Sequence, residues 1–346
     1  MLDSRLAAAL LSAVPVRAHL VLVGDTDQLP SVGAGNVLKD LIAVAETANA
    51  QRSTFNAQPS GSIPGLSSEA LAKEEDAPEL RPGHKASGRI VVTKLTTIYR
   101  QKDQSLIVSV AHAINGGDSA PPPVVSEVAK AQAWSDLNFI TASSPEDCLA
   151  KVTELCTRFI PQHFKWFDPV NDVQVLAPMH KGVAGVANLN TALQAALNPR
   201  QQGLKTVSGE FRPGDKLIQL RNNYDKDLFN GDIGQVLAID GVKGTLTADF
   251  DGAKHTFERG EFGDLALAYA VSIHKSQGSE YPIVIVVLLK AHFVMLQRNL
   301  IYTAITRGRK KVFIVGEPAA YGMAVRNAES KLRCTHLREK ILAATA

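Results

Sequence analysis

The chain lacks the glycine-rich loop, Gly-x-x-x-x-Gly-Lys-Ser/Thr, that cradles nucleotide phosphates; no such run occurs in its 346 residues. An excess of one charge is also absent, because 37 lysines and arginines stand against 34 aspartates and glutamates. A net charge of +3 does not by itself argue for nucleic acid, so any basic surface must be local. No apolar run reaches the roughly eighteen residues of a membrane span, which argues against a membrane protein.

Cysteine is scarce as well. Cys148, Cys156 and Cys334 are scattered and odd in number. We interpret them as reduced thiols of a cytoplasmic protein rather than as a metal site or a disulfide. The apolar stretch 6–14 is similar to the core of a signal peptide, but Asp3 stands where such a peptide is basic. We therefore expect no cleaved leader.

The first third of the chain reads as part of an α/β domain with an interruption. Residues 46–88 are rich in Ser, Ala, Pro, Gly and charge without an apolar period, which predicts a flexible insertion. The residues around it, within a first domain of 1–115, show helical and strand periods. Helices are expected at 3–14, 35–44 and 105–114, a buried parallel strand at 19–23, and strand-like segments at 89–92 and 95–101.

The remaining residues predict a second, doubly wound α/β domain over 124–205 and 266–320. Between its halves, 206–265 shows short strands with the hairpin turns Asn230-Gly231 and Asp251-Gly252, which predicts a small SH3-like β-barrel. The tail 321–346 is expected to form a basic helix. The α/β strands are expected at 137–141, 173–177, 266–272, 283–288 and 312–315, with helices at 145–159, 186–197 and 296–306.

The loop after the first expected strand carries a nucleotide-sensing pattern. Asp25 and Gln28 would lie just past the carboxyl end of strand 19–23, where ligands bind in open α/β sheets. An amide such as that of Gln28 can donate to a γ-phosphate oxygen and accept from an attacking water. The alternative is a polar surface turn without function.

Two arginines follow apolar segments and suit a phosphate. Arg100 ends segment 95–101, and its planar guanidinium can clamp a phosphate, although a single arginine is a weak signal and the alternative is a surface ion pair. Arg307 ends an expected helix next to Gly308. An arginine delivered to a γ-phosphate is worth about 10³–10⁵ in the rate of phosphoryl transfer.

The run 271–280 is the densest cluster of polar chemistry. It places hydroxyl groups, His274 and Lys275 at an expected strand-to-helix turn, where backbone N–H groups favour the phosphates of a nucleotide or of DNA. Gly278 allows close approach, and Glu280 can accept from a ribose hydroxyl.

These segments, in this order, resemble motifs III to VI of a superfamily-one helicase of the RecD-like branch. The resembling segments are 24–41, 95–101, 270–280 and 301–309, with further similarity at 175–182 and 229–234. The resemblance implies a RecA-like (P-loop NTPase-type) α/β fold with parallel sheets, in which a partial first domain precedes a complete second domain. It also implies that Met1 lies just after Walker B, so that Walker A and Walker B are missing from this chain.

The resemblance further implies roles for particular residues. Gln28, Arg100 and Arg307 would approach the γ-phosphate of ATP. Asp25, Gly278 and Glu280 would contact the nucleotide and its Mg²⁺ complex, although full binding of ATP and Mg²⁺ would need the missing motifs. The residues that would face single-stranded DNA are His180, Lys181, His274 and Ser276.

The expected function is the C-terminal motor portion of an ATP-dependent 5′–3′ DNA helicase in recombination or repair, with helicase–nuclease subunits as unknown partners. The chain alone is expected to be inactive. The alternative is a non-catalytic module, derived from a helicase, that binds nucleic acid or a partner protein.

Overall fold

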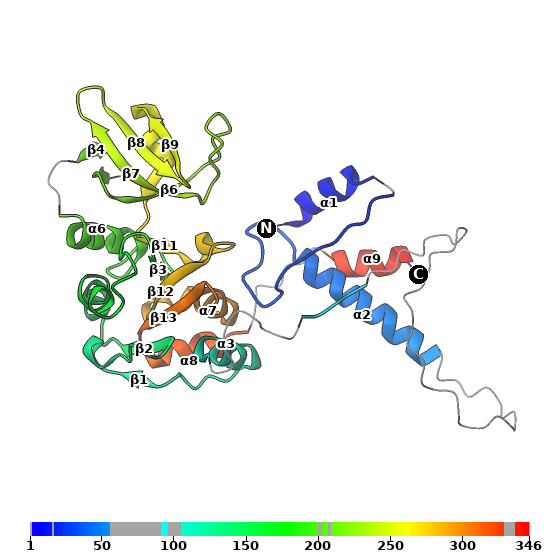
Figure 1. Ribbon diagram of the computed structural model, residues 1–346. Coiled ribbons are helices and arrows are strands. Elements are labelled where there is room, and N and C mark those ends of the chain that lie inside the picture. Colours follow the sequence, from blue (N-terminus) through cyan, green and yellow to red (C-terminus); the bar gives the residue numbers. More distant parts are fainter. Residues whose placement is uncertain are drawn as a thin grey trace, which may run out of the picture. The chain divides into compact units, whose positions relative to one another are not determined.

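The computed structural model describes residues 2–15, 17–55, 91–95, 105–199, 203–206, 209–328 and 336–345. The chain divides into two compact units. Unit 1 comprises residues 1–26, 30–98 and 332–346, and unit 2 comprises residues 27–29 and 99–331. Figure 1 shows both units and labels most of their helices and strands. None of the helices in the described ranges is long and apolar enough to cross a membrane.

The described part of unit 1 consists of three helices and extended segments. The helices are α1 (Ser4–Ala13), α2 (Val37–Phe55) and α9 (Leu337–Thr345). Asp3 begins α1 by accepting a hydrogen bond from the Leu6 amide at 2.8 Å, as an N-cap does. Helices α2 and α9 pack together.

The expected buried strand at 19–23 is wrong. Those residues form no strand, and Val21 and Val23 are 79% and 88% exposed. An apolar run becomes a strand only where a neighbouring strand pairs with its backbone, and the described residues of unit 1 contain no strand at all. Residues 91–95 likewise form no strand, and residues 96–101 lie outside the described ranges.

Two expected helix bounds also change. Helix α2 continues through residues 45–55, which include the start of the expected insertion; alanine, glutamate and glutamine there are good helix formers even without an apolar period. Residues 56–88 of that insertion lie outside the described ranges. The expected tail helix is split into α8 (Pro318–Arg326) and α9, because Asn327 ends α8 and its side-chain amide donates to the Leu296 carbonyl at 2.8 Å.

Unit 2 is built on a six-stranded parallel sheet, as the sequence predicts. The strand order is β1-β2-β13-β12-β3-β11. These strands are β1 (Val124–Val125), β2 (Leu137–Thr141), β13 (Gly308–Gly316), β12 (Tyr281–Leu288), β3 (Val173–Ala177) and β11 (Ala270–Ser272). Strand β12 is buried on both faces and is almost wholly β-branched or leucine, which is typical of a central parallel strand.

Helices cover both faces of this sheet (Figure 1). One apolar core lies against α3 (Leu106–Gly116), α7 (Arg298–Ile305) and α8. The other lies against α4 (Pro145–Glu154), α5 (Ile160–His163) and α6 (Val186–Leu197). Between α4 and α5, residues Leu155–Phe159 form one π-helical turn. Pro161 lacks an N–H and would clash with the carbonyl four residues earlier in a regular α-helix, which accounts for the wider turn.

The insertion in unit 2 is an antiparallel five-stranded sheet around its own core. Its strand order is β10-β6-β7-β8-β9. The strands are β6 (Lys216–Gln219), β7 (Ile233–Asp240), β8 (Thr245–Phe250), β9 (Ala253–Phe257) and β10 (Leu265–Leu267), and a hairpin of β4 (Leu204–Thr206) and β5 (Gly209–Phe211) precedes them. Asp251 and Gly252 both have positive φ, 51° and 87°, as a tight hairpin turn requires.

The expected strand 266–272 is in fact two strands, β10 in the inserted sheet and β11 in the parallel sheet. A buried carboxylate holds this junction together. Asp215 accepts hydrogen bonds from the side chains of Gln194, Asn198 and Tyr269 at 2.6–2.8 Å. Burial and the adjacent Asp215 charge raise the pKa of the Tyr269 hydroxyl. The inserted sheet is therefore fixed to α6 and β11 by hydrogen bonds as well as by its two chain connections.

Candidate nucleotide-sensing and DNA-binding sites

Arg307 is a buried arginine, 6% exposed, whose guanidinium is held by hydrogen bonds to neutral oxygen atoms. Its Nε donates to the Thr303 carbonyl at 3.2 Å and its Nη1 to the Ser279 carbonyl at 3.0 Å. Its Nη2 donates to the side-chain oxygen of Gln28 at 3.1 Å. The structure thus brings together two residues that lie 279 positions apart and that the sequence analysis assigned to one phosphate.

The segment that carries Gln28 is anchored from both sides. The backbone N–H of Leu29 donates to the Thr303 hydroxyl at 2.8 Å, and the Leu29 carbonyl accepts from the Gln277 side chain at 2.7 Å. Leu29 itself is 7% exposed and belongs to the core that covers α7. With its neighbour fixed in this way, Gln28 keeps its amide against Arg307.

Glu280 and Gly278 lie beside this cluster, on the loop that leads into β12. Glu280 faces Arg309 across 3.8 Å between Oε2 and Nε, with both side chains partly exposed; such surface pairs contribute little to stability. Gly278 has a φ of 86°, and no atom lies within 4 Å of where a Cβ would stand. Both residues are therefore accessible to a ligand.

Two of the expected nucleotide contacts cannot be placed in this cluster. Arg100 lies outside the described residues. Asp25 is exposed and belongs to unit 1. Their roles stay predictions.

His180 and Lys181 lie on the loop from β3 to α6, and both are exposed. The loop folds back onto the helix: the N–H groups of the first two residues of α6 donate to the carbonyls of Met179 and His180 at 3.0 and 3.1 Å. Gly185 makes this possible, because a Cβ there would stand 2.4 Å from the Lys181 carbonyl oxygen. The close packing leaves the Lys181 ammonium in solvent, where it can meet a phosphate.

The two DNA residues expected near 274–276 differ in the structure. His274 is half-buried, and burial lowers its pKa. Ser276 is fully buried, and its hydroxyl donates to the Ile273 carbonyl at 2.8 Å. The Ser276 side chain closes the short helix Ile273–Ser276 and offers no surface to a nucleic acid, so we leave it out of the DNA site.

The two candidate sites lie at opposite edges of the parallel sheet. We call the edge where Arg307 and Glu280 directly precede β13 and β12 the nucleotide edge. The opposite edge, where Lys181 and His274 follow β3 and β11, is the DNA edge. Because all these strands run parallel and rise about 3.3 Å per residue, the edges are on the order of 15–25 Å apart. Residues 273–280 run from one edge to the other, since Ser272 pairs with the end of β3 and Tyr281 starts β12.

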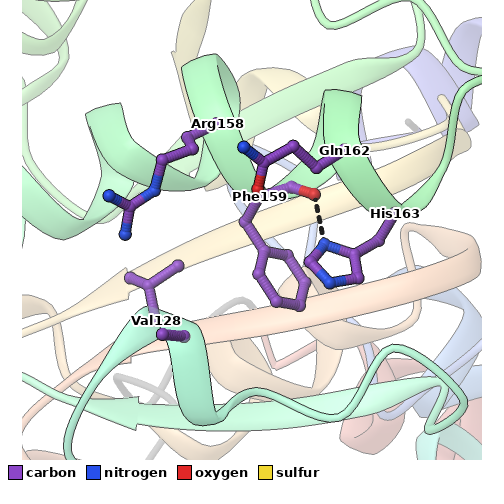
Figure 2. A pocket seen from close by; sticks show the side chains of 6 residues that line it. Val128, Arg158, Phe159, Gln162 and His163 are labelled. Atoms are coloured by element: carbon purple, nitrogen blue, oxygen red, sulfur yellow. Dashed lines mark hydrogen bonds between the residues drawn. The ribbon is translucent and has the colours of Figure 1, made fainter.

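A further hollow lies under the π-helical turn, and none of the expected site residues lines it. Figure 2 shows its lining side chains, among them Arg158, Phe159 and His163. The rings of His163 and Phe159 are stacked at 4.2 Å, and His163 Nδ1 donates to the Phe159 carbonyl at 2.9 Å. His163 is thus satisfied within its own helical turn, and we assign this hollow no chemistry.

The sequence analysis did not single out Gln277 and Thr303 as site residues. Both act on the backbone of Leu29, more than 240 positions away. The one usable signal was that Thr303 stands four residues before Arg307, a helical spacing that brings the two close at the end of α7.

A parallel sheet covered on both faces by helices, with an SH3-like insertion, is a RecA-like α/β architecture. Family models match three parts of the chain: an ATP-dependent RecD-like DNA helicase SH3 domain at residues 189–250, a UvrD-like helicase C-terminal domain at 267–315 and an AAA domain at 1–71.

The resemblance noted from the motifs is confirmed: the chain is similar to RecD-like ATP-dependent DNA helicases. It is 34% identical to the ATP-dependent RecD2 DNA helicase of Deinococcus radiodurans over 99% of this chain and 39% of that protein. It is 29% identical to the RecBCD enzyme subunit RecD of Mycolicibacterium smegmatis over 99% of this chain and 52% of that protein. The chain therefore spans two fifths to one half of these relatives.

Among solved structures, the Pif1 helicase from Bacteroides in complex with ADP-AlF3 and ssDNA is similar over 73% of this chain and 56% of that chain, with 16% identity and a TM-score of 0.42.

Proposed function

We propose that the chain is a motor portion of an ATP-dependent 5′–3′ DNA helicase, which couples ATP hydrolysis to movement along single-stranded DNA in recombination or repair. The observation that carries this proposal is the hydrogen bond between Arg307 and Gln28, fixed by Gln277 and Thr303. A buried, preorganised guanidinium beside an amide suits the charge that develops on a transferred phosphoryl group. The cytoplasm is the compartment in which we expect this work.

The residues at the nucleotide edge fit two parts of an ATP molecule, the γ-phosphate and the ribose. Arg307 and Gln28 would hold the γ-phosphate, and Glu280 would accept from a ribose hydroxyl above the open backbone of Gly278. Bound ATP would supply the free energy for movement. The β-phosphate and Mg²⁺ need a phosphate loop and acidic ligands, and the 346 residues contain no Gly-x-x-x-x-Gly-Lys-Ser/Thr run.

The residues at the DNA edge suit a single strand of DNA that moves across them. Lys181 and His180 are exposed on the hydrogen-bonded loop after β3, and His274 follows the end of the adjacent strand β11. Segment 273–280 joins this edge to the nucleotide edge, so a shift of the γ-phosphate contacts at Arg307 can move the DNA contacts through one short stretch of backbone. Helicase–nuclease subunits are the class of partner we propose.

ATP hydrolysis by two proteins tests this proposal. The 346-residue chain alone should hydrolyse ATP no faster than a blank, with or without oligo-dT. A chimera that carries this chain in place of the matching 39% of the Deinococcus helicase should show DNA-stimulated hydrolysis, and Arg307→Ala in that chimera should lower it by about 10³-fold or more. A chimera whose hydrolysis ignores Arg307→Ala would refute the assignment.

A second function is favoured by one observation, the absence of a phosphate loop from this sequence. As a non-catalytic module, the chain would bind nucleic acid or a partner without turnover. An inactive chimera together with tight DNA binding by the chain alone would favour this reading.

A further inference from the structure

The parallel sheet changes winding direction between β3 and β12, which are neighbours in the sheet. The chain leaves β3 through α6, which packs in the core of one face, and leaves β12 through α7, which packs in the core of the other. The two connections therefore diverge above the carboxyl ends of these strands. In open α/β sheets, ligands bind in the crevice that such a divergence leaves.

A pocket of about 340 Å³ lies at this divergence. Its wall comes from the loop after β3, from the residues after β12 and from the start of α4, and it is largely apolar. Lys181, the exposed lysine of the DNA edge, stands at this wall. The other lining residues are Pro145, Met179, Gly182, Val183, Ala184, Leu289, Ala291 and His292.

One buried polar group lines this pocket. His292 is 4% exposed, and its Nδ1 has no hydrogen-bond partner among the described residues. Burial lowers its pKa, although Glu317 opposes the shift, and this favours the neutral imidazole. A neutral imidazole carries one donor and one acceptor. An unpartnered buried polar atom costs stability, and a ligand with polar edges would satisfy it.

We propose that this pocket takes one nucleobase of single-stranded DNA, with His292 bonded to the edge of the base and Lys181 on the neighbouring phosphate. The occupant must be flat and mostly apolar, must carry donors and acceptors at its rim, and must be attached to an anion. A nucleotide within a strand meets all these demands. This inference rests on the DNA binding proposed above, and it adds that the chain holds a base and not the backbone alone.

The test compares two ligands of equal charge on the 346-residue chain: oligo-dT and an abasic oligomer with the same number of phosphates. The chain should bind oligo-dT about tenfold more tightly, as expected for one sheltered base. Ala291→Trp, at an exposed residue of the pocket wall, should bring the two affinities within about twofold without changing that for the abasic oligomer. His292→Phe, which keeps a ring but removes the hydrogen bonds, should also reduce the preference.

Val294→Trp is the matched control, because Val294 is 64% exposed on the same short helix but does not line the pocket. It should keep the tenfold preference. Equal affinity of the unaltered chain for both ligands would overturn the base pocket and leave DNA binding standing. A preference that survives Ala291→Trp or His292→Phe would overturn it as well. Failure to bind either ligand would instead refute the proposed DNA edge.

Discussion

The nucleotide edge and the DNA edge of the same parallel sheet are built in opposite ways. At the nucleotide edge, Arg307 is buried and bonded to Gln28 and to backbone carbonyls. At the DNA edge, His180 and Lys181 are exposed side chains on a loop whose backbone alone is fixed. A site that must detect the loss of one phosphate benefits from rigid groups. A site that a strand must slide across benefits from solvated cations that any phosphate can meet.

The largest expected effect on stability comes from removing the buried guanidinium of Arg307 at the nucleotide edge. Arg307→Ala should lower the free energy of unfolding by about 2–4 kcal/mol, because at least three hydrogen bonds are lost and buried acceptors remain unpaired. Urea denaturation followed by circular dichroism measures the change. Arg309→Ala is the control: that arginine is largely exposed and makes a 3.8 Å ion pair, so its loss should cost less than about 0.5 kcal/mol. Equal losses would contradict the buried network.

The second effect concerns the loop under Lys181. Gly185→Ala places a Cβ against the Lys181 carbonyl, which should cost about 1–3 kcal/mol in stability and weaken oligo-dT binding, because the loop must shift. Gly263→Ala, where no atom lies within 4 Å of the new Cβ, should change neither quantity. If Gly185→Ala alters stability but not DNA affinity, the loop geometry is irrelevant to binding.

A third effect is the pH dependence of stability that follows from the two histidines whose pKa burial lowers. Burial lowers the pKa of His274 and of His292 below the ordinary value of 6.5. The unfolded chain then binds more protons between 6.5 and the lowered values, so stability should decline as the pH falls below 6.5, by at most about 1.4 kcal/mol per pH unit for each histidine. Urea denaturation between pH 7.5 and 5 measures this slope. His292→Phe should flatten it, and an unchanged slope would show that His292 does not contribute.

The sequence predicts unit 2 well, whereas in unit 1 it predicts the helices α1 and α2 but wrongly predicts the strand 19–23. The bounds of β2, β3 and α6 agree with the expected ranges, because each has a clear apolar period between turn residues. Val21 and Val23 have the same strand-like composition, yet they are exposed. The difference is the pairing partner, which a local pattern does not reveal.

The candidate sites show a similar division. The motif order pointed to Gln28 and Arg307, but not to the contacts of Leu29 with Gln277 and Thr303 that fix them. The helicase resemblance implied that Ser276 would face DNA, whereas its hydroxyl is buried against its own helical turn. Residue type and spacing identify a cluster of chemistry, but side-chain direction depends on the packing around it.

The most direct test of separate edges is a fluorescence-anisotropy titration of oligo-dT at several salt concentrations. About three phosphate contacts should give a slope near −2 for log K against log salt, at about −0.7 per contact. Lys181→Ala should weaken binding and flatten the slope by about 0.7, whereas Arg307→Ala, assayed under conditions where it is folded, should leave both unchanged. Loss of binding in Arg307→Ala with no effect of Lys181→Ala would show that the nucleotide and DNA edges are wrongly assigned.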